Sequence, residues 1–575
     1  MRILSIELSS FRSFAAARIS LNEGMNLVVG ENNVGKSSLL GAIDVLRSLP
    51  GSTLPSSLWP DGRPSTPLEL SMTLRFHNRE LGRISGRMRF GESRELLDPR
   101  AFAERFGNHL FAKITWERPN YARALQMEFR DTSGNRRADV SPSMGNEYVS
   151  QGEKITFGSA VYDEITSILS DQVVSFPEFR QRPQASGAEV LRSTEGLHVA
   201  SVLFLLKNGT RAQEKRFKRV KSSFSKIFPG LRLEVTKAPG SPPTLVVEKK
   251  VTLHRLPLDQ VGGGIAEMII MLTHISAEQS KVFLLDEPEL HLHPHSQRLL
   301  RGILQKSSLD NQFIVVTHSP HFIDSGDLSS IILVREVSGR STVTKLGERY
   351  LNQREIGAVA KNLGTAEKEF LFSRRVLLVE GQTEVGALPI LAKKVSRGFD
   401  SLGVSLVSVG GNSFGLMLKV LTGFQFPWLA ICDRDVLMNV SGTIEVEQKE
   451  AKCNRFFEAI DKAALIDADD EKVLLGSQDH IEKTIQDGKV KFTFDDDQFD
   501  PFNTSATRHG FRIIAPDFEG YLKANGCRAL FDEAERIYGT NKVLQGRYVA
   551  EQMSTVPTTL KSVILEVTAR NFIQA

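Results

Sequence analysis

The segment from Gly30 to Ser37 constrains the fold of this chain more than any other stretch. It reads Gly-Glu-Asn-Asn-Val-Gly-Lys-Ser and fits the phosphate-binding pattern Gly-x-x-x-x-Gly-Lys-Ser/Thr. The apolar residues at 25–29 predict a strand directly before the loop, and residues 38–49 have a helical pattern. Because the motif requires a strand before it and a helix after it, the sequence predicts an α/β domain that binds a nucleoside triphosphate.

The residue types in this loop suit a phosphate group. Two glycines let the backbone bend so that its N–H groups point at phosphate oxygens. The lysine adds a positive charge, and the serine that follows it offers a hydroxyl to Mg²⁺. The N-terminus of the following helix also favours an anion. The predicted nucleotide-binding residues of this segment are Gly30, Asn32, Asn33, Gly35, Lys36, Ser37 and Ser38, with Ser37 also a Mg²⁺ ligand.

Length and composition indicate a large protein with an ordinary surface. A chain of 575 residues predicts roughly three or four domains. The net charge of +4 gives no strong electrostatic signature, so any nucleic-acid contact must come from local basic patches. Its three cysteines form no Cys-x-x-Cys pair, which argues against a disulfide framework and a zinc ribbon. Without an apolar run long enough to span a membrane, or a signal-peptide pattern, the sequence predicts a cytoplasmic protein without a membrane contact.

A second part of the nucleotide site is predicted near residue 286. The apolar run Val282 to Leu285 is followed by Asp286 and Glu287, which suits a buried parallel strand whose end carries two carboxylates. We expect Asp286 to bind Mg²⁺ and Glu287 to contact the attacking water. A further apolar strand at 313–316 precedes His318, which is in a position to contact the γ-phosphate.

Three features of this half remain open from sequence. The helix predicted at 211–228 has an apolar stripe and is otherwise crowded with Lys and Arg. It is either a contact with the DNA backbone or the solvated face of a packed helix. Gly262, Gly263 and Gly264 before a helical run have an anion-binding shape, but the signal is weak alone. Three histidines at 291, 293 and 295 lie in a Pro-interrupted loop, where their spacing disfavours a zinc site.

Acidic residues follow two apolar strands in the C-terminal half. Glu380 follows the apolar run 375–379, and Glu384 lies one helical turn later. Asp433 and Asp435 follow a second strand predicted at 427–432. Carboxylates at the ends of parallel strands meet at one edge of an α/β sheet, and two Mg²⁺ ions held there can clamp both oxygens of a phosphodiester. The sequence therefore predicts a metal site built from Glu380, Glu384, Asp433 and Asp435.

Taken together, the first-half motifs resemble ABC-type ATPases of the RecF and SMC kind. The resembling segments are 11–14 (Phe-Arg-Ser-Phe), the phosphate loop, 285–294 (Leu-Asp-Glu-Pro-Glu-Leu-His-Leu-His-Pro) and 317–319 (Thr-His-Ser). The resemblance implies that Lys36, Ser37, Asp286, Glu287 and His318 take these roles, and that two heads enclose ATP. The chain departs from the pattern at 259–264, where Asp-Gln-Val-Gly-Gly-Gly stands in place of Leu-Ser-Gly-Gly-Gln.

The C-terminal half resembles a Toprim domain. Its union with the ATPase is similar to the overcoming lysogenization defect (OLD) nucleases, a family that includes the nuclease subunit of the Gabija antiphage system, and the resemblance covers nearly the whole chain. It implies metal binding by Glu380, Glu384, Asp433, Asp435 and Glu519, with Lys542 as a further catalytic residue. The implied domains are 1–165 and 245–365 (ABC-type ATPase), 166–244 (helical dimerisation insert) and 366–575 (Toprim nuclease).

The resemblance implies an ATP-binding, Mg²⁺-dependent DNA endonuclease or nickase in antiphage defence, with Mn²⁺ or Ca²⁺ as alternatives at the nuclease site. It also implies a homodimer or larger homo-oligomer, and leaves open a partner from a defence operon, such as a helicase or a reverse-transcriptase system. The alternative from another class is a non-cleaving ATP-dependent DNA clamp or sensor. A topoisomerase fits less well because it needs a tyrosine nucleophile on a separate DNA-binding domain, and a primase because a zinc ribbon is expected.

Overall fold

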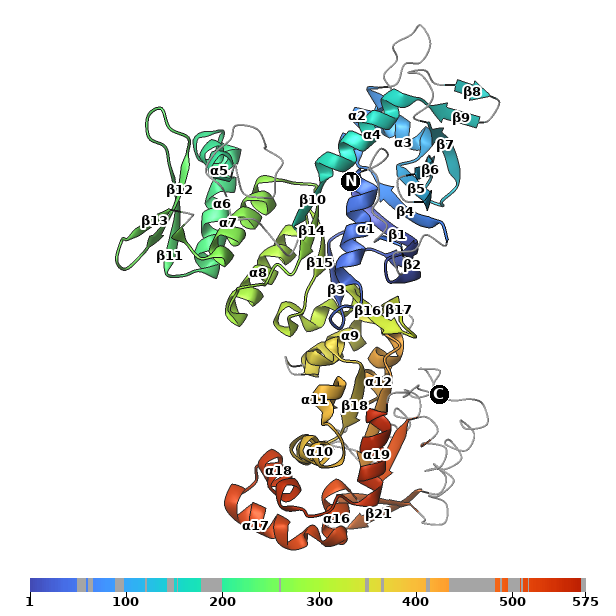
Figure 1. Cartoon of the computed structure of the whole chain (residues 1–575), viewed down its shortest axis with the longest axis vertical. Helices are drawn as coiled ribbons and strands as arrows, with labels where there is room; N and C mark the ends of the chain where they lie inside the picture. Colours follow the sequence, from blue (N-terminus) through green and yellow to red (C-terminus); the bar gives the residue numbers. More distant parts are fainter. Residues whose placement is uncertain are drawn as a thin grey trace. The chain divides into compact units, whose positions relative to one another are not determined.

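The computed structural model divides the chain into two compact units, coloured along the sequence in Figure 1. The first unit comprises Met1–Ile323 and Ser330–Val343, and the second comprises Asp324–Ser329 and Thr344–Ala575. The structure describes all residues except 49–57, 60–65, 88–97, 119–120, 142–148, 152–153, 177–198, 258–259, 347–350, 363, 365–366, 410–413, 434–480, 487–488, 495–506, 508–509, 516 and 570–575.

A parallel sheet forms the core of the first unit. Its strands run in the order β10 (Val173–Phe176), β14 (Val282–Asp286), β15 (Gln312–Val316), β3 (Met25–Val29) and β16 (Ile331–Val337). All residues of β3, β14 and β15 are buried, as expected for strands covered on both faces. The predicted strands at 25–29, 282–285 and 313–316 are confirmed, and they are adjacent or nearly adjacent in the sheet.

The same sheet continues on its other side into a largely antiparallel region. Long antiparallel pairings join β2 to β1, β1 to β4, β4 to β5 and β5 to β6. The early strands therefore extend the nucleotide-binding sheet, and the described sheet has 14 strands. After β16 come β17 (Arg340–Lys345), β2 (Phe14–Ser20), β1 (Arg2–Phe11), β4 (Leu68–Arg75), β5 (His109–Arg118), β6 (Tyr121–Arg130), β7 (Arg136–Val140), β9 (Lys154–Phe157) and β8 (Val149–Gln151).

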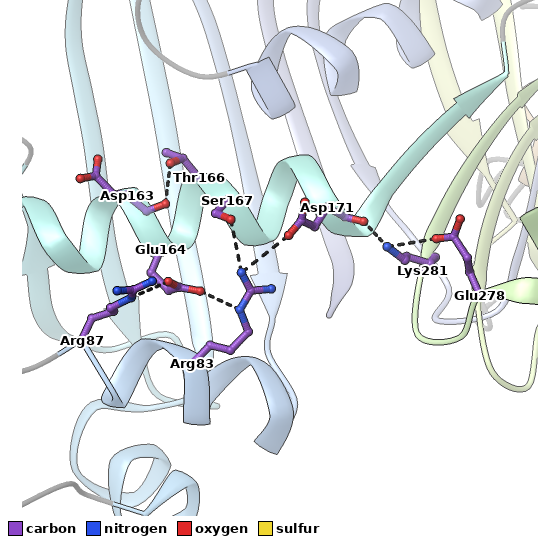
Figure 2. A network of polar contacts seen from close by, with 9 residues as sticks. All are labelled: Arg83, Arg87, Asp163, Glu164, Thr166, Ser167, Asp171, Glu278 and Lys281. Carbon is purple, nitrogen blue, oxygen red and sulfur yellow. Dashed lines mark hydrogen bonds and ion pairs between the residues drawn. The ribbon is translucent and has the colours of Figure 1, made fainter. Parts of the chain in front are cut away.

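Helix α4 (Ser159–Gln172) leads directly into β10 and is fastened by ion pairs, shown in Figure 2. Arg83 and Arg87 each donate to the buried Glu164 carboxylate, at 2.6 and 2.7 Å. At the end of α4, Lys281 donates to the backbone carbonyl of Asp171 and pairs with Glu278 at 3.0 Å. Because Lys281 immediately precedes β14, this network holds the neighbouring strands β10 and β14 in register.

A smaller module of the first unit consists of helices and a three-stranded sheet. Helix α6 (Arg211–Ile227) contacts α5 (Val199–Asn208), α7 (Gly263–Ala277) and α8 (Pro294–Ser307). Thr210 caps α6 by accepting a hydrogen bond from the backbone N–H of Gln213 at 3.4 Å. The helix predicted at 211–228 is confirmed as α6, and the helical run expected after Gly264 is confirmed as α7. The small sheet has the order β11 (Leu231–Thr236), β12 (Thr244–Lys249), β13 (Arg255–Pro257).

The second unit is built on a parallel four-stranded sheet. Its order is β19 (Val404–Ser408), β18 (Arg375–Val379), β20 (Trp428–Asp433), β23 (Phe511–Ile514). The strands predicted at 375–379 and 427–432 are thus neighbours. The helices of this unit are α9 (Gln353–Asn362), α10 (Gln382–Val395), α11 (Phe399–Leu402), α12 (Phe414–Gly423), α16 (Phe518–Leu522), α17 (Arg528–Tyr538), α18 (Lys542–Gln552) and α19 (Thr558–Thr568).

The remaining described elements complete the two units. In the first they are α1 (Lys36–Ser48), α2 (Asn78–Ser85) and α3 (Pro99–Phe106), and in the second a hairpin of β21 (Ile481–Gln486) and β22 (Lys489–Phe494). No helix of the described part of the chain is long and apolar enough to cross a membrane.

Candidate functional site

The phosphate loop connects β3 to α1 through a backbone that requires glycine at two positions. Gly30 has φ 141° and Gly35 has φ 98°, both in a region that other residues rarely adopt. A Cβ at position 30 would also overlap the carbonyl oxygen of Val334 in the neighbouring strand β16. The loop residue Asn33 has φ 64°, a conformation that Asn tolerates better than most residues. The sequence therefore forms a tight loop at the start of a helix, as a phosphate site requires.

Lys36 is buried in the centre of this loop. Its Nζ donates to the carbonyl oxygen of Gly30 at 3.0 Å and to that of Glu31. Burial lowers the pKa of Lys36 to about 8, although Glu287, Asp286 and Glu31 favour its charged form. A bound phosphate would stabilise this buried ammonium group strongly, because its oxygens would replace the water that burial has removed and would add negative charge.

Two predicted Mg²⁺ ligands lie side by side. The Ser37 hydroxyl at the start of α1 donates to Oδ1 of Asp286, at the end of β14, over 3.2 Å. Asp286 is buried, so its carboxylate is oriented rather than free to rotate in solvent. A hydroxyl and a carboxylate oxygen this close are oxygen donors that suit Mg²⁺ bound beside nucleotide phosphates.

Glu287 and His318 form the next pair. The Nε2 of His318 lies 3.3 Å from Oε1 of Glu287. Burial, together with the nearby charge of Lys36, lowers the pKa of His318 to about 4. A pKa this low leaves the His318 ring neutral at physiological pH, so it faces Glu287 as a neutral imidazole rather than as a cation. Glu287 has φ 46°, and its N–H donates to the carbonyl oxygen of Val316 at 3.0 Å.

A buried carboxyl group that sequence analysis missed, Glu289, supports His318. Oε1 of Glu289 accepts hydrogen bonds from the Thr317 hydroxyl and from the backbone N–H of His318, the latter at 3.0 Å. Oε2 is buried without a hydrogen-bond partner among the described residues. Burial raises the pKa of Glu289 to about 7, against the effect of these hydrogen bonds. Glu289 is thus a buried positioning residue for the loop that carries His318, and near neutral pH it is far more protonated than an exposed glutamate.

Glu289→Gln should remove a pH-dependent loss of stability. In the unfolded chain Glu289 ionises near its ordinary pKa of 4.5, whereas in the fold it stays protonated to about pH 7. The free energy of unfolding therefore falls as pH rises from 4.5 through 7, by at most about 3 kcal/mol. Urea unfolding is followed by the fluorescence of Trp59 and Trp116 in a Trp428→Phe background, so that only the first unit reports.

The expected result is that the Gln variant gains stability relative to its parent between pH 5.5 and pH 8. An equal difference between the two proteins at both pH values would show that Glu289 is ionised throughout.

The glycine-rich segment before α7 lies against the loop that follows β14. Gly262 is the N-cap residue of α7, and a Cβ at Gly264 would come within 2.8 Å of the His291 Cβ. Asp259, the first residue of the predicted signature, lies outside the described residues. The nearby histidines form no metal group among the residues that the structure describes. Instead, Nδ1 of His295 lies 2.8 Å from Nη2 of Arg298.

In the second unit, the described members of the predicted acidic set lie at or after the carboxyl ends of neighbouring parallel strands. Glu380 directly follows β18, Asp433 ends the adjacent strand β20, and Glu519 lies in α16, which follows β23. Oδ1 of Asp433 accepts a hydrogen bond from the backbone N–H of Phe518 at 2.9 Å, which ties the end of β20 to the start of α16. Asp435 lies outside the described residues, as do the acidic clusters at 469–471 and 495–497.

Hydrogen bonds and ion pairs join the helices around this edge. Glu384, in the first turn of α10, accepts a hydrogen bond from the backbone N–H of Gly381 at 3.3 Å. Glu519 accepts from the Thr383 hydroxyl at 2.8 Å and pairs with Lys542 at the start of α18, also at 2.8 Å. The structure thus brings Lys542 beside Glu519, although Lys542 is distant in sequence from Glu380, Glu384 and Asp433.

The electrostatics of this edge fit a divalent cation. Burial raises the pKa of Glu384, and the negative charges of Glu519 and Asp517 add to this effect. Burial also raises the pKa of Cys432, again with a contribution from the neighbouring carboxylates. Burial would raise the pKa of Glu519 too, but the hydrogen bonds from Lys542 and Thr383 outweigh it and lower this pKa. Crowded carboxylates would be relieved by a cation, whose preferred ligands are carboxylate oxygens.

Described side chains alone do not complete such a centre. Among the described residues, no group of three or more His, Cys, Asp or Glu is close enough to hold one ion. The ligand set of the second unit therefore stays a prediction that includes Asp435.

Two glycines let α10 and α18 approach closely enough to place Lys542. A Cβ at Gly386 would overlap the carbonyl oxygen of Val543, and a Cβ at Gly546 would overlap that of Thr383. Sequence analysis missed this contact because neither glycine belongs to a motif.

Gly546→Ala should force the two helices apart. We expect it to destabilise the second unit by about 1–3 kcal/mol and to slow cleavage, because Lys542 moves away from Glu519. Stability is measured by urea unfolding and cleavage on plasmid DNA. The control is Gly357→Ala in α9, where a Cβ meets open space. Equal stability and activity of both variants would contradict the role of the helix contact.

Comparison with known protein families agrees with the two units. Residues 371–435 match the TOPRIM domain of overcoming lysogenization defect protein-like proteins. Residues 1–52 match an AAA ATPase domain, and residues 163–324 match an AAA domain.

Individual relatives are similar over part of their length. The OLD nuclease of Thermus scotoductus is 30% identical over 193 residues, which are 32% of this chain and 37% of that protein. Endonuclease GajA of Bacillus cereus is 28% identical over 27% of this chain and 26% of its own length. The Old nuclease of Escherichia phage P2 is 28% identical over 32% of this chain and 33% of its own length. The chain thus spans well under half the length of these relatives.

A solved SMC head bound to the C-terminal winged-helix domain of ScpA has a TM-score of 0.39 at 15% identity, over 62% of this chain and 99% of that one. A likeness this low does not bear on function.

The matched domains and the observed sheets agree with the sequence-based fold class. This chain therefore joins an N-terminal AAA-type P-loop ATPase to a C-terminal TOPRIM domain of the overcoming lysogenization defect type.

Proposed function

We propose that this chain is a nucleotide-regulated, Mg²⁺-dependent DNA endonuclease or nickase. The proposal is supported by the neighbouring parallel strands that end beside Glu380 and Asp433, by the hydrogen bond that joins Asp433 to α16, and by the pairing of Glu519 in α16 with Lys542. Several relatives are named nucleases, which supports the same reaction class. The proposal includes a cytoplasmic homodimer or larger homo-oligomer acting in antiphage defence.

The acidic residues divide the work of phosphodiester hydrolysis. Asp433 and Asp435 would hold the metal together with Glu380, and Glu519 would be a further ligand. When bound, the metal polarises a phosphate oxygen and activates water. Glu384, whose raised pKa favours proton uptake, would accept a proton from the attacking water. Lys542 would stabilise the negative charge that develops on the phosphate.

The ATPase unit supplies nucleotide control. Lys36 and the loop N–H groups would bind the phosphates, and Ser37 with Asp286 would hold Mg²⁺. Glu287 would orient water, with His318 fixing its carboxylate and sensing the γ-phosphate. These residues would bind a nucleotide and hydrolyse it. Whether the bound nucleotide activates or inhibits DNA cleavage is decided by the experiment below.

The test is incubation of purified protein with supercoiled and with linear DNA, in Mg²⁺ or Mn²⁺, with and without ATP. We expect cleavage that requires the metal and changes with ATP. ATP hydrolysis without cleavage of either DNA, in either metal, would contradict the nuclease and favour a non-cleaving clamp or sensor.

A further inference from the structure

The module from Val199 to Pro257 has a larger positive net charge than the whole chain. Between these residues, all of which the structure describes, there are thirteen Lys and Arg but three Asp and Glu, a net charge of +10. The whole chain has a net charge of +4, so the rest of it is acidic on balance. Such a local excess of one sign creates a field that attracts a polyanion.

The charge is concentrated along one face of α6. Its exposed cations lie at i, i+4, i+7, i+8 and i+15, so they fall within about 100° of the helix circumference and along about 22 Å of its length. The opposite face is largely apolar and is buried against α5, α7, α8 and β11. The exposed basic face of α6, defined here by its cations, consists of Arg211, Lys215, Lys218, Arg219 and Lys226.

Most cations of this face are not neutralised within the unit. Lys218 pairs with Glu214 at 2.5 Å on the helix surface. No described carboxylate pairs with Arg211, Lys215, Arg219 or Lys226. By contrast, the flanking Lys221 pairs with Glu234 at 2.5 Å. Unpaired surface cations in a row are held close together against their own repulsion, which a bound line of phosphates would relieve.

Although the family resemblance implies that the insert at 166–244 dimerises, a second copy of this chain is a poorer occupant of the basic face itself. Two such faces brought together in a symmetric dimer would place like charges opposite each other. A single-stranded nucleic acid is also disfavoured, because stacking its bases requires exposed aromatic rings. No Phe, Tyr or Trp side chain is exposed between Val199 and Pro257. A duplex backbone, which presents charge without unstacked bases, fits both observations.

We propose that the exposed basic face of α6 binds the phosphate backbone of double-stranded DNA. The choice of DNA rather than RNA rests on the proposed nuclease function. Binding of this kind is independent of base sequence, because phosphates carry no sequence information. The module would hold the duplex electrostatically while the TOPRIM residues act on it.

The test compares two variants with equal loss of charge. Lys215→Gln/Lys226→Gln removes two cations from the basic face, and Lys306→Gln/Lys561→Gln removes two exposed lysines elsewhere. Binding of a labelled 30-base-pair duplex is followed by fluorescence anisotropy in EDTA, so that no cleavage occurs, at several salt concentrations. We expect the first variant to bind about tenfold more weakly or worse near 0.1 M salt, with a salt dependence of log K shallower by about 2. The control should match the wild type.

Three results would overturn the proposal. The first is unchanged affinity and salt dependence in the Lys215→Gln/Lys226→Gln variant. The second is unchanged DNA binding with an altered sedimentation coefficient, which would make this face a contact between copies. The third is tighter binding of a duplex RNA of equal length with the same dependence on these lysines. Cleavage is assayed separately in Mg²⁺, so that DNA binding without cleavage contradicts the proposed function and leaves this inference standing.

Discussion

Asp433→Asn is expected to lower the rate of DNA cleavage by about a thousandfold or more. The substitution removes one negative charge from the predicted metal site, and a metal supplies several kcal/mol of transition-state stabilisation, each 1.4 kcal/mol being a factor of ten. Asn keeps an oxygen that can accept the hydrogen bond which Asp433 accepts from the N–H of Phe518. The fold should therefore survive, and the loss should appear in plasmid cleavage at saturating metal.

The matched control is Asp532→Asn, an exposed acid in α17 of the same unit. It should cleave at the wild-type rate, and both variants should bind ATP as the wild type does. Cleavage by Asp433→Asn within a few-fold of the wild type would exclude this carboxylate from the metal site.

Lys36→Ala is expected to weaken ATP binding by about a hundredfold or more. The ammonium group is buried in the phosphate loop, and charge-assisted hydrogen bonds to phosphate contribute about 1.5–3 kcal/mol each. Affinity is measured by titration calorimetry with ATP and Mg²⁺.

Glu287→Gln serves as the companion variant. It keeps the shape of the site and the charge of Lys36, so it should bind ATP normally while hydrolysis slows by about a hundredfold or more. If Lys36→Ala bound ATP with unchanged affinity, the nucleotide would have to occupy another place.

The strands and helices that bear the nucleotide site could be predicted because each has a strong local signal. The strand at 25–29 is buried and apolar except for Asn26, and the helix after the loop begins at the motif lysine, Lys36, rather than at Ser38 as expected. The strands that end beside Asp286, Glu380 and Asp433 could be predicted from their apolar runs. In each unit these strands run parallel to their neighbours, so their carboxyl ends lie along one edge of the sheet.

Residues placed by packing could not be predicted in the same way. Glu289 looks like one more acid after a strand, and its raised pKa follows from burial, which local sequence does not reveal. The approach of α10 to α18 depends on Gly386 and Gly546 facing each other across a distance in sequence. The placement of Lys542 beside Glu519 follows from that approach, and only a family resemblance pointed to it.

Helix α6 could be predicted from the sequence, but the pairing of its cations could not. Its helical period and apolar stripe predict α6 almost to the residue. Whether its cations are paired depends on strands and helices that come later in the chain, such as β11 with Glu234. The sequence therefore left two readings open, and the pairing seen in the structure favours one of them.

The nuclease centre proposed at the carboxyl edge of the TOPRIM sheet is tested by comparing the wild type with Glu380→Gln. Both proteins are incubated with supercoiled plasmid in Mn²⁺, and ATP affinity is measured on the same samples. We expect nicked or linear product with the wild type, none with the variant, and equal ATP affinity for both. Equal cleavage by the two proteins would contradict a nuclease centre at the carboxyl edge of the TOPRIM sheet.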